Sequence, residues 1–170
     1  HVVMGVWDGR LVVWDFATRR LLPTTKEHAA WVTVVAVAPD GKTIATASCD
    51  RTVNLWDAAT FEHLVRLRGH VGEVSSLAIS PDGRTVASGS PDGTTKLWRT
   101  NRRHGAPVLA GVGLVAGFTG GARQLVAATS NRWCVWTPEN GARVDFPIPS
   151  SPTVITSGKP SGKPYDVKPD

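Results

Sequence analysis

The sequence has few of the patterns that mark several large classes of protein. Its 170 residues include two cysteines, Cys49 and Cys134, and these lack the spacing of a metal site or a redox motif. No apolar run approaches the roughly 18 residues that a membrane-spanning helix needs, and no signal peptide is visible. The two cysteines fall in different repeat units, so a disulfide is not favoured. We therefore expect a cytoplasmic protein that does not enter the membrane.

Patterns that support catalysis are also scarce. The five histidines are dispersed along the chain, and no Gly-x-Ser-x-Gly motif is present. Serine, histidine and aspartate do recur together, but always with a tryptophan that hydrolytic chemistry does not need. A catalytic triad also requires an exposed nucleophile and an oxyanion hole. We predict a protein that is not an enzyme and has no catalytic, cofactor-binding or metal-binding residues.

Acidic residues are fewer than basic ones, 14 against 19, which gives a formal net charge of +5. The basic residues are scattered, without a helical stripe or an RNA-binding aromatic motif, so a nucleic-acid partner is not favoured. One basic cluster comprises Arg99, Arg102, Arg103 and His104. We interpret this cluster as a solvated loop, with an acidic partner or a phosphate as the alternative ligand.

A tandem repeat of 42 residues organises the chain. The pairs His28 and His70, Asp50 and Asp92, and Trp56 and Trp98 are each separated by this period. The end of the unit also occurs earlier in the chain, at Asp8 and Trp14. A period in the low forties that closes on Trp-Asp is typical of a propeller blade.

The sequence of each repeat unit predicts four short strands. VTVVAV (32–37) and VSSLAI (74–79) are β-branched runs that end at Pro-Asp-Gly, a tripeptide that favours a tight turn. Further strands are expected at TIATASC (43–49), TVNLWD (52–57), HLVRLRG (63–69), TVASGS (85–90) and TTKLWR (94–99). A sheet of this size cannot bury both of its faces alone, so neighbouring sheets must stack.

These repeats resemble the WD-repeat (WD40) family. The resemblance rests on two complete units, residues 28–57 and 69–99, on a unit end at WDGRLVVWD (7–15), and on a degenerate unit that ends at WCVWTP (133–138). It implies an all-β fold: a β-propeller of four-stranded antiparallel blades over residues 1–149, with units ending near Asp15, Asp57, Arg99 and Thr137. Propellers of this family usually close with about seven blades. We therefore expect a partial propeller of about 3.5–4 blades, which begins inside a second strand and is part of a longer protein.

The resemblance also implies one buried hydrogen-bonded set in each complete blade. The two sets are His28, Ser48, Asp50, Trp56 and His70, Ser90, Asp92, Trp98. Thr46 and Ser88 lie two residues earlier on the same strand face and are alternatives to the two serines. The degenerate unit keeps Trp136, but it has Gly-Gly-Ala (120–122) and Ser-Asn (130–131) at the turns, and His104 is its nearest histidine.

Propellers of this family bind partners with the loops at the top rim. The resemblance places seven residues there: Trp7, Trp31, Thr33, Cys49, Glu73, Ser75 and Pro91. An exposed indole is a typical binding hot spot, although Trp31 could also pack under its own loop. We predict a non-catalytic protein–protein interaction scaffold with protein or peptide partners. The alternatives are nucleic-acid or acidic-partner binding, and a regulatory or sensor domain of a multidomain signalling kinase or ATPase.

Residues 147–170 differ in composition from the rest, since they hold six of the twelve prolines together with serine, glycine and lysine. We expect residues 150–170 to form a flexible tail, with a short strand at TVIT (153–156) as the alternative. Arginine exceeds lysine, and alanine, valine and glycine are abundant, which hints at a bacterial source. A partial ring exposes the faces of its end blades, so self-association is expected.

Overall fold

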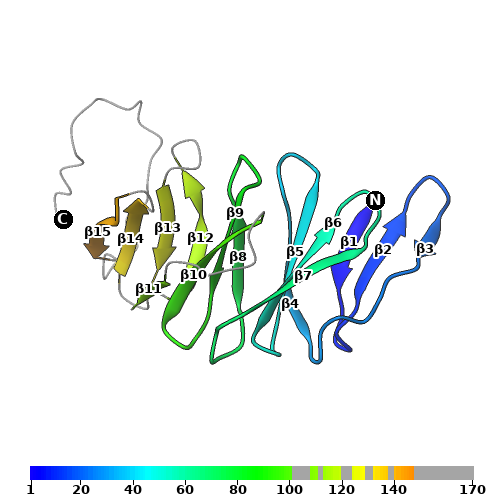
Figure 1. Ribbon diagram of the computed structural model, residues 1–170, viewed down its shortest axis with the longest axis horizontal. Coiled ribbons are helices and arrows are strands. Elements are labelled where there is room, and N and C mark those ends of the chain that lie inside the picture. The colour runs from blue at the N-terminus through cyan, green and yellow to red at the C-terminus, as the bar shows by residue number, and fades with distance from the viewer. Residues whose placement is uncertain (101–107, 111–112, 120–123, 129–131, 138–139, 148–170) are drawn as a thin grey trace, which may run out of the picture.

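The computed structural model describes residues 1–100, 108–110, 113–119, 124–128, 132–137 and 140–147. These residues form 15 strands and no helix. The strands make four antiparallel sheets, and the order of strands in each sheet follows the order of the chain. Figure 1 shows the sheets side by side in one row, with β1–β3 at one end and β12–β15 at the other. The chain is therefore an all-β partial propeller, as the repeat predicts.

Each sheet is one blade. Blade 1 comprises β1 (Val2–Gly5), β2 (Leu11–Asp15) and β3 (Arg20–Leu22). Blade 2 comprises β4 (Val32–Val37), β5 (Thr43–Ser48), β6 (Thr52–Asp57) and β7 (His63–Arg68). Blade 3 comprises β8 (Ser76–Ile79), β9 (Thr85–Gly89), β10 (Thr94–Arg99) and β11 (Val108–Ala110). Blade 4 comprises β12 (Leu114–Thr119), β13 (Gln124–Ala128), β14 (Arg132–Thr137) and β15 (Ala142–Pro147). The proposed tail at 150–170 lies outside the described residues.

Strand β8 begins later than the sequence predicts. The apolar run starts at Val74, but the strand starts at Ser76. The Val74 amide donates to the Ser48 carbonyl of blade 2 (3.1 Å), and the Ser75 amide donates to the Gly89 carbonyl (2.9 Å). The Val74 amide thus bonds to blade 2, and the first strand of blade 3 begins two residues later.

The core consists of apolar layers between adjacent blades. Blades 1 and 2 enclose Leu11, Val13, Ile44, Trp56 and Phe61, all buried. The layer between blades 2 and 3 holds Ala45, Ala47, Val53, Leu55, Leu67, Val74 and Val86. The layer between blades 3 and 4 holds Ala87, Leu97, Val115, Leu125, Ala127, Cys134 and Trp136. Each blade therefore buries a face only by packing on a neighbour.

Small residues let the blades approach closely. Ala45, Ala47 and Ala87 are completely buried. A Cβ at Gly89 would lie 2.5 Å from both the Gly113 carbonyl oxygen and Ser76 Oγ, which leaves no room for a side chain there.

The blades are also joined by hydrogen bonds that recur with the repeat. The Val32 amide donates to the Val6 carbonyl (3.2 Å), and the Val74 amide donates to the Ser48 carbonyl (3.1 Å). Donors and acceptors are each 42 positions apart. The same bond thus joins blade 1 to blade 2 and blade 2 to blade 3.

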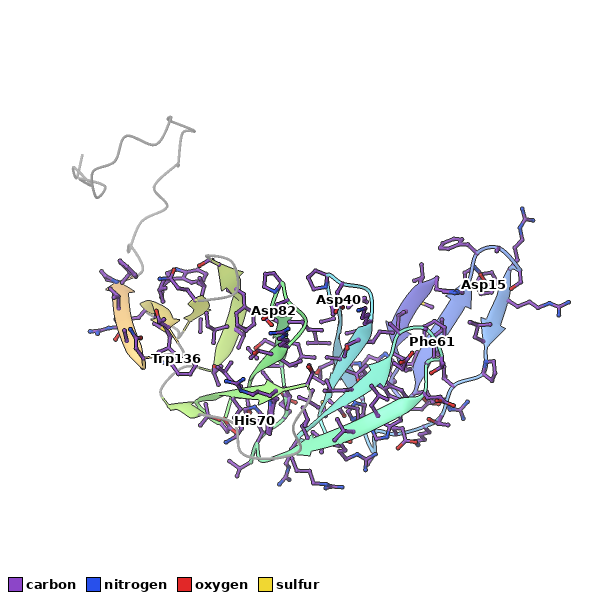
Figure 2. The ribbon with its side chains drawn as sticks, turned by 45° about the horizontal axis from the view of Figure 1, so that its top comes forward. Asp15, Asp40, Phe61, His70, Asp82 and Trp136 are labelled. Carbon is purple, nitrogen blue, oxygen red and sulfur yellow. The ribbon has the colours of Figure 1, made fainter. Side chains whose placement is uncertain are left out.

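The two Pro-Asp-Gly turns take the shape that their sequence predicts. Gly41 and Gly83 have positive φ (69° and 68°), and the preceding Asp40 and Asp82 accept the amides of Lys42 and Arg84. Figure 2 shows Asp40 and Asp82 together on one edge of the row of blades and His70 on the other edge. The Pro-Asp-Gly turns thus lie on one rim, and His70 lies on the opposite rim.

Candidate functional site

The rim that carries His70 is built on two hydrogen-bonded sets of nearly equal geometry. His28 Nδ1 lies 3.0 Å from Asp50 Oδ2, and His28 Nε2 lies 2.8 Å from Thr46 Oγ1. The Trp56 indole donates to the same Thr46 hydroxyl (2.9 Å). In the next blade the corresponding distances are 3.0, 2.8 and 2.8 Å. The members of this second set are His70, Asp92, Ser88 and Trp98.

One arrangement of protons satisfies each set. The indole N–H donates to the hydroxyl oxygen, the hydroxyl donates to Nε2, and Nδ1–H donates to the carboxylate. The imidazole is then neutral and has a partner on both nitrogens. A network in which every buried polar group is paired holds the loop and strands of its blade in one geometry.

The aspartate of each set accepts further hydrogen bonds. Asp50 accepts the Ala29 amide (2.9 Å), the Thr52 amide (3.0 Å) and the Thr52 hydroxyl (2.6 Å). Asp92 makes the same three bonds to Val71 and Thr94. The threonines were not anticipated as members of the network. The recurrence of Asp-x-Thr after one period was the available signal.

The environment shifts the pKa of each titratable member downward. Burial lowers the pKa of His28 and His70, although Asp50 and Asp92 oppose this by favouring the charged imidazole. Burial alone would raise the pKa of the two aspartates. Hydrogen bonds from the threonines, the loop amides and the histidines outweigh burial, so both carboxyl groups have a pKa below the usual range. The sets therefore combine a neutral imidazole with an ionised carboxylate at neutral pH.

Ser48 and Ser90 do not link histidine to tryptophan, so their assignment to that role is wrong. The Ser48 hydroxyl donates to the Ala30 carbonyl (3.1 Å) and accepts the Asp50 amide (3.0 Å). Ser90 Oγ accepts the Asp92 amide (3.1 Å). Trp56 pairs with Ile44 across the sheet, so Thr46 is the next residue on that face, and Ser48 is about 7 Å farther along the strand. The indole reaches the nearer hydroxyl.

The linking hydroxyls are not accessible nucleophiles. Thr46 and Ser88 have no exposed surface, and His28 and His70 are also buried. Trp136 of blade 4 is buried in the equivalent strand position, whereas His104 and residues 120–122 and 130–131 lie outside the described residues. The geometry of the two complete sets is that of a structural network.

The exposed part of the rim contains an aromatic pair from two blades. The rings of Trp7 and Trp31 stack with centroids 4.2 Å apart and an angle of 4° between their planes. Trp7 is 76% exposed and Trp31 is 41% exposed, so Trp31 packs on its neighbour and not under its own loop. Two large apolar side chains are thus presented to solvent in a fixed orientation.

A polar contact extends this pair toward blade 3. The Cys49 amide donates to the Trp31 carbonyl (3.0 Å), and the Cys49 thiol donates to Glu73 Oε2 (3.4 Å). Burial and the Glu73 carboxylate raise the pKa of the Cys49 thiol, which keeps it protonated as a donor. We call Trp7, Trp31, Cys49 and Glu73 the rim row. It crosses blades 1, 2 and 3 as a stacked indole pair beside an exposed carboxylate.

The remaining residues assigned to the rim have other surroundings. The Thr33 hydroxyl donates to the Val74 carbonyl of blade 3 (2.5 Å), and Ser75 bonds to the Gly89 carbonyl through its amide and hydroxyl. Both side chains are half-buried. Thr33 joins blade 2 to blade 3, whereas Ser75 bonds within blade 3. Pro91 is exposed, in the turn before Asp92.

A separate hollow of about 530 Å³ lies between the linker after β3 and the β6–β7 turn. Its lining includes Glu27, Phe61, Glu62 and His63. Glu27 is already paired with Arg66, whose nitrogen lies 3.4 Å from its carboxylate. No residue of the rim row lines this hollow.

The described ranges hold neither a metal-binding cluster nor a membrane-spanning helix. No group of three or more histidine, cysteine or acidic side chains there could hold a metal ion. No helix in those ranges has the length and apolar character that crossing a membrane would require.

Comparison with known proteins identifies the repeats. Residues 19–57 and 61–99 match the family model described as "WD domain, G-beta repeat", so these two segments are WD40 repeats. A solved chain from "Structure of U3-55K" superposes with a TM-score of 0.72 at 23% sequence identity, which shows a shared fold. The match covers 85% of this chain and 47% of that one, so this chain spans about half of that chain's length. No curated protein matches the sequence.

Proposed function

From two WD40 repeats on a partial propeller, we propose that this chain is a protein-interaction scaffold that binds a peptide segment of its partner on the rim row. WD40 repeats indicate a domain of the scaffold kind. The observation that carries the proposal is the exposed, stacked pair of Trp7 and Trp31.

The stacked pair suits binding for an energetic reason. Each indole restricts the other, so a ligand that packs on them has less side-chain freedom to remove than it would on isolated exposed tryptophans. Tryptophan is also among the residues most often found at binding hot spots. The pair therefore offers apolar contact area at a low entropic cost.

Glu73 defines the chemistry of the partner. Its carboxylate is exposed and is held by the Cys49 thiol beside the indole pair. A peptide with an apolar side chain followed by a basic one can pack the first on the indoles and pair the second with the carboxylate. The same carboxylate repels phosphate groups, so the rim row does not favour nucleic acid.

The test is a peptide-display selection with the purified chain, followed by calorimetry on the selected peptides. Trp7→Ala and Trp31→Ala should each weaken binding about thirtyfold, which corresponds to roughly 2 kcal/mol for a hot spot. Leu64→Ala is the matched control, because Leu64 is an apolar side chain of blade 2 that is 54% exposed on the outer strand β7. The affinity of the Leu64→Ala variant for the selected peptides should stay within about twofold of that of the unmodified chain.

A second variant tests the contribution of the Glu73 carboxylate to affinity separately from that of the two indoles. Glu73→Gln should weaken binding of peptides that carry a basic residue and reduce the dependence of their affinity on salt. Equal affinities for Trp31→Ala and Leu64→Ala would remove the rim row as the binding site.

A further inference from the structure

The hollow between the linker after β3 and the β6–β7 turn has the size of a small-ligand site. Its volume is about 530 Å³, within the range of pockets that hold small molecules. The linker supplies one wall, which includes Thr25 and Glu27. The turn supplies the other wall, which includes Thr60, Glu62 and His63. The hollow is thus built by segments of two adjacent blades.

Hydrogen bonds and packing hold both walls in place. On the turn, Asp57 Oδ1 accepts the Thr60 amide (2.9 Å), and the Phe61 amide donates to the Asp57 carbonyl (2.9 Å). The Phe61 side chain, labelled in Figure 2, is buried in the layer between blades 1 and 2. On the linker, the Thr24 hydroxyl donates to the Leu11 carbonyl of β2. A ligand would therefore enter a preformed site and would not have to order its walls.

The charge of the lining is opposite to that of the chain. The chain has a formal net charge of +5, yet the lining contains two carboxylates, those of Glu27 and Glu62, and neither lysine nor arginine among the described residues. Glu62 is exposed and pairs with no basic side chain in the part of the chain that the structure describes. The hollow is therefore a local region of negative charge on a basic protein.

Arg66 compensates only one of the two carboxylates. Its guanidinium nitrogen lies 3.4 Å from Glu27 Oε2, which leaves Glu27 Oε1 without a bond to any described residue. His63 adds no positive charge at neutral pH, because burial lowers the pKa of its imidazole, and Arg66 adds to this effect although Glu27 opposes it. The Nε2 atom of His63 is buried and has no hydrogen-bond partner among the described residues. The negative charge of Glu62 and several acceptor atoms thus remain available.

The acidic lining is not part of the repeat. Residues that the scaffold requires recur after 42 positions, as the members of the histidine sets do. One period after Glu27 the sequence has Gly69, and one period after Glu62 it has His104. The two carboxylates are therefore specific to the junction of blades 1 and 2, and the blade fold does not account for them.

We propose that this hollow binds a small organic cation, an amine or a guanidinium group on a short apolar stem. Glu62 and the Oε1 atom of Glu27 accept charged N–H donors, and the Thr60 hydroxyl is a further acceptor. Pro23 supplies apolar contact for the stem. The volume favours a free small molecule as the ligand, because a single basic side chain of a partner protein would fill only part of it. This site is independent of peptide binding on the rim row.

The test is calorimetric titration of the purified chain with agmatine and with putrescine. Both cations should bind with a Kd below about 1 mM, whereas glutarate, an anion, and butanol, an uncharged stem, should not bind. Amide chemical shifts followed by nuclear magnetic resonance during the titration should change in residues 23–27 and 60–63.

Three variants test the role of the charge. Glu62→Gln keeps the shape of the side chain and should weaken binding of both cations by about fivefold, the upper range for an exposed ion pair. Thr60→Arg, which copies Arg102 of the next unit, places a cation in the hollow and should abolish binding. Glu73→Gln is the matched control, since it removes an exposed carboxylate outside the hollow, and its affinity for the cations should stay within about twofold of that of the unmodified chain. Thr60 and Glu62 are both exposed, and circular dichroism confirms that each variant folds.

Three results would overturn the proposal. The first is equal affinity of the Glu62→Gln and Glu73→Gln variants for agmatine. The second is a set of shift changes in the rim row and none in residues 23–27 and 60–63. The third is binding of an arginine-containing tripeptide by a chain that binds neither agmatine nor putrescine, which would assign the hollow to a partner's side chain.

Discussion

At the scale of single residues, the network depends on the hydroxyl that stands between imidazole and indole. Thr46 and Ser88 fill this role in blades 2 and 3, and each has two partners and no exposed surface. Threonine and serine serve equally because only the hydroxyl is used.

Removal of this hydroxyl should lower the stability of the fold, even when the replacement keeps the shape of the side chain. Thr46→Val leaves the Trp56 N–H and His28 Nε2 unpaired, so the free energy of unfolding should fall by about 2–4 kcal/mol. Thr46→Ser, which copies blade 3, should lose less than about 1.5 kcal/mol, the range for loss of a methyl group. Urea unfolding of the three proteins provides the comparison. Equal stability of the valine and serine variants would show that the hydroxyl has no such role.

The same residues predict how stability depends on pH. His28 and His70 have a pKa below the usual value of about 6.5, so the unfolded chain binds more protons than the folded one as pH falls below that value. Their stabilising contribution is complete above about pH 7 and should be lost progressively below about 6.5. Asp50 and Asp92 also have a lowered pKa, which adds a second loss below about pH 4.

Melting temperature measured from pH 8 to pH 3 should therefore fall in two stages. His70→Asn should be less stable at pH 8 but should show a shallower fall between pH 7 and pH 5, since one of the titrating groups is gone. A melting temperature that rises as pH is lowered from 7 to 5 would contradict the assigned protonation states.

At the scale of strands and turns, close packing between blades restricts certain positions to glycine. Gly89→Ala should destabilise the protein by roughly 1–3 kcal/mol, because its Cβ would meet the Gly113 carbonyl and Ser76 Oγ at 2.5 Å. Gly117→Ala is the control: it lies in β12, where a Cβ meets nothing within 4 Å. Thermal denaturation of the two variants should separate them clearly, and similar melting temperatures would mean that the blades can move apart without cost.

Strands could be predicted well from the sequence because blade formation is local. The bounds of β4 and β6 coincide with the apolar runs between turn signals. The start of β8 could not be predicted, because the Val74 amide bonds to the Ser48 carbonyl of blade 2. The local sequence contains no pattern that indicates this bond. The choice between Thr46 and Ser48 was open for a related reason. Both lie on the same face of one strand, and only the reach of Trp56 across the sheet decides between them.

The rim row, too, could be predicted only in part from the sequence. The period placed Trp7, Trp31, Cys49 and Glu73 at equivalent or adjacent loop positions around the rim. The stacking of Trp7 on Trp31 depends on the angle between two blades, which the repeat length alone does not determine.

At the scale of the whole molecule, the apolar layers formed by the described residues each join two blades that are neighbours in sequence. Within the part of the chain that the structure describes, blades 2 and 3 are covered on both faces, whereas blades 1 and 4 are covered on one. Stability in such an array is the sum of contributions from each blade and from each interface, so it should be highest in the middle. Hydrogen exchange should be slowest for the amides of β5, β6 and β9 and faster for those of β1, β2 and β14.

Uniform protection of all four blades in a monomer would contradict the nearest-neighbour description.

The bonds from Val32 to Val6 and from Val74 to Ser48 have a consequence at the level of the gene. Because the corresponding residues of successive joints are one period apart, an in-frame duplication or deletion of 42 codons within the repeats would reconstruct an intact joint. A single recombination event can thus lengthen or shorten the array by one whole blade. The length of the array would then change in whole blades, and the remaining joints would keep the bonds that they have here.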